Sequence, residues 1–103
     1  MSGRYKDSWE QFHTASFEFK VMELIRLELE LALTFVNLAH TKYSMGNVVG
    51  ADVSGNNAAK AYRTALYYFG KLADLSSSER RKLNGLANQA KQAIANLPKA
   101  DTK

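Results

Sequence analysis

The chain has 103 residues, of which 46% are apolar and 23% are charged, a size and composition that fit one globular domain and argue against a disordered chain. It contains no cysteine, which excludes disulfides, thiolate catalysis and cysteine-ligated metals, and it has no apolar run of the length of a signal peptide or a membrane span, so we expect a cytoplasmic chain. The net charge of +4 comes from the C-terminal half, because residues 57–103 carry nine Lys and Arg against three Asp and Glu.

The pattern of apolar residues indicates helices. They recur with a period of about 3.6 residues rather than alternating as in a strand, and the single proline stands close to the C-terminus, at Pro98. The sequence therefore predicts one all-α domain over 1–103, a three-helix bundle in which a long first helix is followed by an antiparallel helical hairpin.

The first helix is predicted over about 8–43. It opens at Ser8, where Ser8-Trp-Glu-Gln11 has the form of a capping box. Weak helix formers from His13 to Ser16 leave open whether the helix is continuous or kinked near Thr14–Ser16. Its broad apolar face comprises Phe17, Val21, Met22, Leu24, Ile25, Leu29, Leu31, Ala32, Phe35, Val36, Leu38, Ala39 and Tyr43.

A loop is predicted over 44–56, since this stretch is rich in glycine and other turn residues and has no sustained apolar period. The second helix is predicted over about 57–73 and the third over about 77–97, after a second capping box, Ser76-Ser-Ser-Glu79, and before the helix stop at Pro98. The short link between these two helices predicts that they are antiparallel. Their expected buried faces comprise Ala58, Ala61, Tyr62, Ala65, Tyr68, Phe69 and Leu72, and then Leu83, Leu86, Ala87, Ala90, Ala93, Ile94 and Leu97.

Residues around the predicted loop carry a family resemblance. Leu38-Ala39 supplies a leucine followed by a small residue, Tyr43 a first-helix aromatic, and Gly46-Asn47 the pair that closes that helix. The second helix continues the spacing with Ala58, Tyr62 and Ala65-Leu66. Residues 33–70 thus resemble a single tetratricopeptide repeat whose turn is longer by about seven residues, with Gly70 near the family's usual proline. The resemblance implies a helical-hairpin scaffold and binding of a protein or peptide; a microtubule-interacting and trafficking domain is similar in outline.

Residues able to carry chemistry are few. The two histidines, His13 and His40, lie at opposite ends of the first helix, and His40 has no Asp or Glu three or four residues away, so we expect no metal site. Gly46, Gly50 and Gly55 lack the ending of a phosphate loop. Since the serines gather at predicted caps, away from any histidine with an acidic partner, we expect no cofactor and no enzymatic activity.

Glu28 is the charged residue that fits its surroundings least, because it lies at the apolar face of the first helix between Leu24 and Leu31. A buried carboxylate needs a partner. We expect an ion pair with a Lys or Arg of another helix or of a second subunit, and a general acid or base is the alternative hypothesis. His40, near the polar edge of the same face, is the second candidate for a buried polar residue.

The length of the first helix points to self-association. At ~54 Å it outruns the other two, which reach only ~27–32 Å. Either a kink folds its N-terminal end back or a second copy covers it, and we favour a homodimer. The candidate interface comprises Trp9, Phe12, Phe17, Phe19, Val21, Met22, Leu24 and Ile25.

The sequence therefore predicts a non-enzymatic interaction or structural module. Its partner would be a second copy of the chain, with a further protein or peptide partner as an additional hypothesis. Two alternatives from other classes stay open. A nucleic-acid-binding accessory protein would use the basic C-terminal half, and a small-molecule-binding domain would bring Glu28, His40 and Tyr62 together in a pocket.

Overall fold

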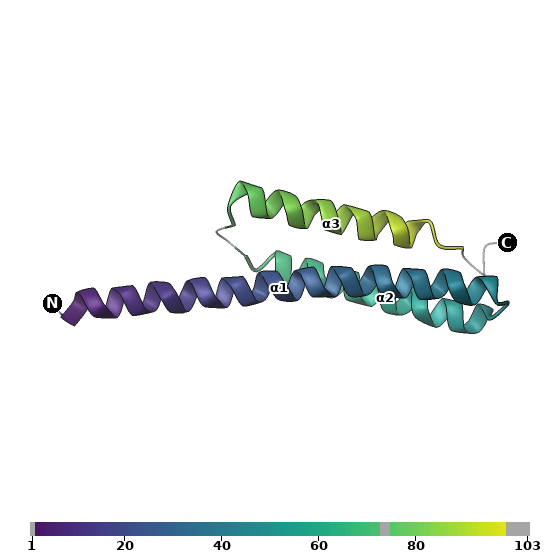
Figure 1. Ribbon diagram of the computed structural model, residues 1–103, viewed down its shortest axis with the longest axis horizontal. Helices are drawn as coiled ribbons and strands as arrows, with labels where there is room; N and C mark the ends of the chain where they lie inside the picture. Colours follow the sequence, from purple (N-terminus) through teal and green to yellow (C-terminus); the bar gives the residue numbers. More distant parts are fainter. Residues whose placement is uncertain (1, 73–74, 99–103) are drawn as a thin grey trace.

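The computed structural model describes residues 2–72 and 75–98, with side chains from residue 17 onward. Over these residues the chain forms three helices and no strand: α1 (Ser2–Ser44), α2 (Val48–Phe69) and α3 (Ser77–Ala95). α2 runs back along the C-terminal half of α1, and α3 then runs in the opposite direction to α2 (Figure 1). The predicted all-α three-helix bundle is confirmed.

α1 is one uninterrupted helix of 43 residues, nearly twice the 22 residues of α2 and more than twice the 19 of α3. It passes through Thr14–Ser16 without a break, so of the two options that the sequence left open the continuous helix is the observed one. It begins at Ser2 rather than at the predicted Ser8, because extending a formed helix by residues other than proline costs little. Its N-terminal part extends beyond both other helices (Figure 1).

The turn between α1 and α2 consists of Met45–Asn47. Gly46 has φ +78°, a left-handed conformation that glycine adopts without steric cost. The Gly46 amide donates to the Tyr43 carbonyl at 3.0 Å and the Asn47 amide to the Lys42 carbonyl at 2.8 Å, the two bonds of a Schellman helix end. Asn47 also caps α2, because its Oδ1 accepts a bond from the Gly50 amide at 2.9 Å.

The predicted loop over 44–56, and with it the lengthened turn of the repeat resemblance, is wrong, because α2 already begins at Val48. The reason is a line of small buried residues, Ala51, Ser54, Ala58, Ala61 and Ala65, each 5% exposed or less. Their spacing of three and four residues puts them on the side of α2 that faces α1, and their size lets the two helices approach closely. This packing outweighs the roughly 1 kcal/mol that each glycine costs inside a helix.

The core lies where the three helices meet. α1 packs most tightly against α2, and α3 completes the core. As predicted, α3 begins after a cap in which Ser76 Oγ accepts a bond from the Glu79 amide at 3.1 Å. α2 ends at Phe69 and α3 at Ala95, each slightly before its predicted end. The core cluster comprises Ile25, Leu29, Ala32, Ala61, Ala65, Leu72, Leu83, Ala87 and Ala90.

Two side-chain contacts fix how α1 and α2 are aligned. Lys42 Nζ donates to Ser54 Oγ at 3.0 Å, and the Tyr43 hydroxyl lies 2.8 Å from Asp52 Oδ1. The same hydroxyl lies 2.8 Å from the Pro98 carbonyl oxygen, so Asp52 and Pro98 share the one proton that Tyr43 can donate. This contact also holds the segment after α3 to the other two helices. Because α1 and α2 are antiparallel, a residue nearer the N-terminus of α1 lies beside a residue nearer the C-terminus of α2.

Candidate functional site

A second line of apolar residues runs along α1 outside the core. Phe17, Leu24, Leu31 and Leu38 follow one another at intervals of seven residues, which places them on one side of the helix. Phe17 is 66% exposed and Leu31 and Leu38 are each 42% exposed, while Leu24 is half-buried. We call these four residues the α1 stripe. α1 therefore carries apolar side chains on two sides, of which only one is covered by α2 and α3.

α2 extends this apolar surface. Val53 and Tyr67, 53% and 61% exposed, lie seven residues before and seven residues after Lys60, on the same side of α2. Val49, near the start of the helix, is 76% exposed and lies four residues before Val53. Exposed apolar residues thus occur on both helices.

An open groove of about 350 Å³ lies between α1 and α2. Ala61, only 5% exposed, belongs both to the groove and to the core beneath it. Leu31 of the α1 stripe stands on one wall, so the stripe and the groove form one continuous face. The lining residues are Glu28, Leu31 and Phe35 from α1 and Asn57, Lys60, Ala61 and Thr64 from α2.

Glu28 and Lys60 give the two walls opposite charges. Glu28 is half-buried rather than buried as predicted, because it lies beside the buried line of Ile25 and Leu29 and not on it. Lys60 is exposed. Among the described residues the ion pairs within 4 Å involve Arg26 with Glu23 and Glu30, so Glu28 and Lys60 share the groove without an ion pair of that length.

The structure divides the predicted interface residues. Ile25 is fully buried in the core, and Val21 and Met22 pack against the core. The prediction that Ile25 belongs to an exposed interface is therefore wrong, because α2 and the segment after it reach far enough along α1 to cover this position. Phe17 and Phe19 are exposed, at 66% and 59%. They stand two residues apart and therefore point to different sides of α1. Trp9 and Phe12 lie outside the residues whose side chains are described.

The small-molecule hypothesis required Glu28, His40 and Tyr62 to line one pocket, and the structure does not bring these three residues together. His40 is exposed, so it is not the buried polar residue that the sequence predicted, and Tyr62 packs against the core. Neither lines the groove with Glu28. Among the residues with described side chains, no three His, Asp or Glu come together as a metal-binding group.

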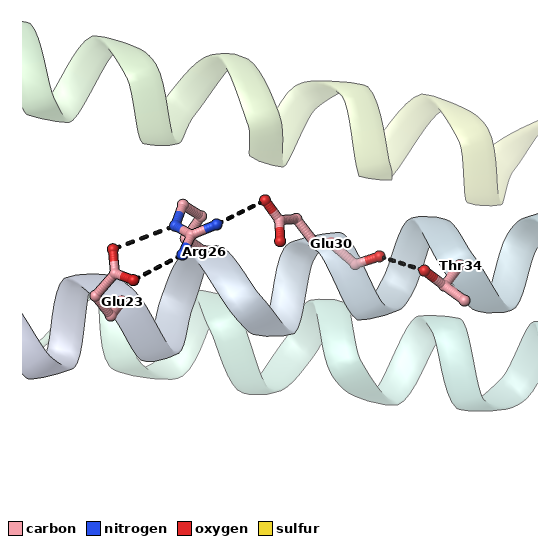
Figure 2. A network of polar contacts seen from close by, with 4 residues as sticks. All are labelled: Glu23, Arg26, Glu30 and Thr34. Carbon is pink, nitrogen blue, oxygen red and sulfur yellow. Dashed lines mark hydrogen bonds and ion pairs between the residues drawn. The ribbon is translucent and has the colours of Figure 1, made fainter.

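A polar network occupies another side of α1 (Figure 2). Arg26 donates to Glu23 through Nη2 at 2.6 Å and through Nε at 3.2 Å, and to Glu30 through Nη1 at 2.8 Å. The hydrogen bonds from Arg26 lower the pKa of Glu23, and those to Glu23 and Glu30 raise the pKa of Arg26. All three side chains are 42% to 49% exposed and stand three or four residues apart, so the network supports α1 locally and marks a solvated side. Thr34 donates to the Glu30 carbonyl at 3.1 Å beside it.

The basic residues of the C-terminal half are shared between two helices. Lys71 Nζ lies 5.0 Å from the centre of the Tyr67 ring, and the Arg80 guanidinium lies 5.7 Å from that of Phe69, so two of the cations contact aromatic rings of α2. The exposed basic side chains of α2, α3 and the turn after α2 are Lys60, Arg63, Lys71, Arg81, Lys82 and Lys91.

The sequence placed all four residues of the α1 stripe on one broad apolar face and assigned only Phe17 and Leu24 to an interface as well, so it did not separate the stripe from the core face. The signal was present, since the seven-residue interval from Phe17 to Leu38 is visible in the sequence. Sequence reasoning missed the groove although the residues of its α2 wall lie in the predicted second helix, because which sides of α1 and α2 border each other depends on contacts between residues distant in sequence. Within the described part of the chain, no helix has the length and apolar content needed to cross a membrane.

Comparisons with known proteins add no family to this description. No protein family matches the chain, and no curated protein or solved structure matches it either. The resemblance of residues 33–70 to a tetratricopeptide repeat stays a prediction.

Proposed function

We propose that the chain is a non-enzymatic interaction module that associates with a second copy of itself through the α1 stripe and the adjoining groove. The observation that carries the proposal is an apolar residue every seven residues along one side of α1, exposed at Phe17, Leu31 and Leu38 and half-buried at Leu24. Apolar residues repeated at this interval form a continuous seam that a second helix covers in coiled coils and helical bundles. Exposing such an apolar surface to water is unfavourable in free energy, so a partner that covers it stabilises the chain.

The shape of the molecule supports a partner. Its radius of gyration is 18.4 Å and its longest dimension is 69 Å, whereas a compact domain of this length has a radius of gyration of about 13 Å. Its accessible surface is 7508 Å². A compact monomer of its mass of 11.5 kDa exposes about 5,800 Å², so the chain exposes ~1,700 Å² more than such a monomer.

That excess is large enough for a stable dimer. Dimer interfaces of ordinary size bury about 800 Å² on each partner, which is roughly half of the excess on this chain. Closed two-fold symmetry lets one self-complementary surface satisfy both copies. A single α1 face can therefore serve both subunits.

The test is the mass of the native chain in solution. Light scattering coupled to size exclusion, over a dilution series from about 100 µM downward, should give twice the monomer mass of 11.5 kDa at the upper end and a fall toward the monomer on dilution. A mass of 11.5 kDa throughout the series would contradict the proposal.

A further inference from the structure

The groove and the α1 stripe together specify how two copies would meet, an inference that rests on the self-association proposed above. Two features of the face constrain the arrangement. The stripe is symmetric about Leu31, with Leu24 seven residues before it and Leu38 seven residues after it. The groove has an acidic residue, Glu28, on the α1 wall and a basic residue, Lys60, on the α2 wall.

Two copies that pack face to face can be related by a two-fold axis along the helices or across them. An axis along the helices puts α1 over α2 of the other copy, so that the two α1 stripes do not meet. An axis across the helices puts α1 antiparallel to the other α1. If this axis passes Leu31, the two Leu31 side chains meet and each Leu24 meets Leu38 of the second copy. Only the second arrangement pairs the stripe with itself.

The charges agree with this axis. Ser54 of α2 is hydrogen-bonded to Lys42 of α1, so these two residues lie at the same level along the bundle. Lys60 is six residues after Ser54, and since the two helices are antiparallel it lies at the level of Val36, six residues before Lys42. A two-fold axis at Leu31 therefore places Lys60 of the second copy at the level of the α1 position five residues before Leu31. That level is within one helical turn of Glu28.

With an axis along the helices, Glu28 and Lys60 of the second copy stay eight α1 positions apart, about 12 Å along the bundle. Both side chains line the groove, and therefore border the space that the second copy fills.

We propose that two copies form an antiparallel dimer around Leu31, in which the α1–α2 hairpins build a four-helix bundle and Glu28 of each chain pairs with Lys60 of the other. Two ion pairs then flank the central Leu31 contact. Opposite charges placed in this way select one register among those that the apolar stripe alone would allow.

The absence of cysteine from the chain makes the axis directly testable by disulfide formation. In the proposed dimer the two Leu24 positions lie fourteen residues apart along the bundle, about 21 Å, whereas Leu24 of one chain meets Leu38 of the other. Leu24→Cys and Leu38→Cys should therefore each stay unlinked alone and form a mixed disulfide dimer when combined under mild oxidation. A linked homodimer of Leu24→Cys alone, from a protein whose native form is dimeric, would overturn the arrangement and leave self-association standing.

Charge reversal tests the ion pairs. Glu28→Lys and Lys60→Glu should each raise the dimer Kd by about tenfold, because each sets like charges against each other. Mixing these two variants should restore the native Kd in a heterodimer, since both contacts then join opposite charges. An ion pair within one chain would not be restored by mixing. The control pair is Glu79→Lys with Lys91→Glu, exposed residues of α3 with the same charge changes.

The outcomes separate the two proposals. A native chain that is monomeric overturns both. A native dimer whose charge variants keep the native Kd, or whose mixture binds no better than the α3 control mixture, overturns the Glu28–Lys60 pairing alone. Circular dichroism of each variant shows whether the helices are kept, and a variant that loses them is replaced by Glu28→Gln or Lys60→Gln, each expected to weaken the dimer.

Discussion

Leu31→Ala gives the sharpest single perturbation of the proposed interface, because Leu31 belongs to both the α1 stripe and the groove. Leu31 is 42% exposed in the single chain, and this fraction is what a second copy can still cover. Burying a whole leucine side chain is worth about 1.5–3 kcal/mol. Covering the exposed fraction on both chains of a two-fold dimer then contributes about 1.3–2.5 kcal/mol. Leu31→Ala should raise the dimer Kd by about 8- to 70-fold.

The matched control is Leu66→Ala. Leu66 is the same residue type, is 44% exposed, and belongs neither to the groove nor to the core cluster. Sedimentation equilibrium over concentrations that bracket the native Kd should show a weakened Leu31→Ala dimer and a Leu66→Ala dimer within about twofold of native. If the two variants weaken the dimer equally, the assignment of the interface to this face is refuted.

Three further predictions concern the fold that presents this face. Leu29→Ala, at a fully buried position, should lower the free energy of unfolding by about 2–5 kcal/mol in urea denaturation. Gly46→Ala should lower the same quantity by about 1 kcal/mol, because alanine is strained at φ +78°; an unchanged midpoint would argue against this helix end. Since Arg26 lowers the pKa of Glu23 in the folded chain, the stabilisation by Glu23 is present above the ordinary glutamate pKa and lost as the pH falls through the lowered value. NMR titration of the Glu23 carboxyl should show this lowered pKa, and Arg26→Gln should return it to the ordinary range.

Much of the fold could be predicted from local signals. The 3.6-residue period of apolar residues gave the three helices, and the Ser76–Glu79 cap marked the start of α3 correctly. The expected buried positions Leu29, Leu83 and Ala87 lie in the core. These features follow from side-chain periodicity and helix capping, which act within a few residues of the chain.

The start of α2 could not be read from the same signals. Gly50 and Gly55 favour a turn when only neighbours along the chain are considered, yet Ala51 and Ser54, 1% and 2% exposed, are buried in the finished fold. That stabilisation exists only once the bundle has formed, so local propensity could not report it. An added Cβ at Gly55 would lie 3.4 Å from Leu97 Cδ1, which shows how close the segment after α3 comes to α2 there.

The candidate site was only half predictable. The sequence placed Phe17, Leu24 and Ile25 together in an interface, but Ile25 is buried in the core. How far α2 and the segment after it reach along α1 sets which α1 residues are covered. Glu28 was singled out from its apolar neighbours as one half of an ion pair or as a general acid or base, but its place on a groove wall opposite Lys60 of α2 could not be read from the first helix alone. Contacts between residues distant in sequence decide both questions.

Small-angle X-ray scattering tests the central claim most directly, because it reports mass and shape together. The chain measures 69 × 21 × 18 Å with a radius of gyration of 18.4 Å. Two copies packed side by side along α1, with centres no more than about 20 Å apart, should double the forward scattering while the radius of gyration rises only to about 21 Å. A forward scattering that stays at the monomer value up to high concentration, or a doubled value with a radius above about 30 Å from end-to-end association, would contradict self-association along the α1 face.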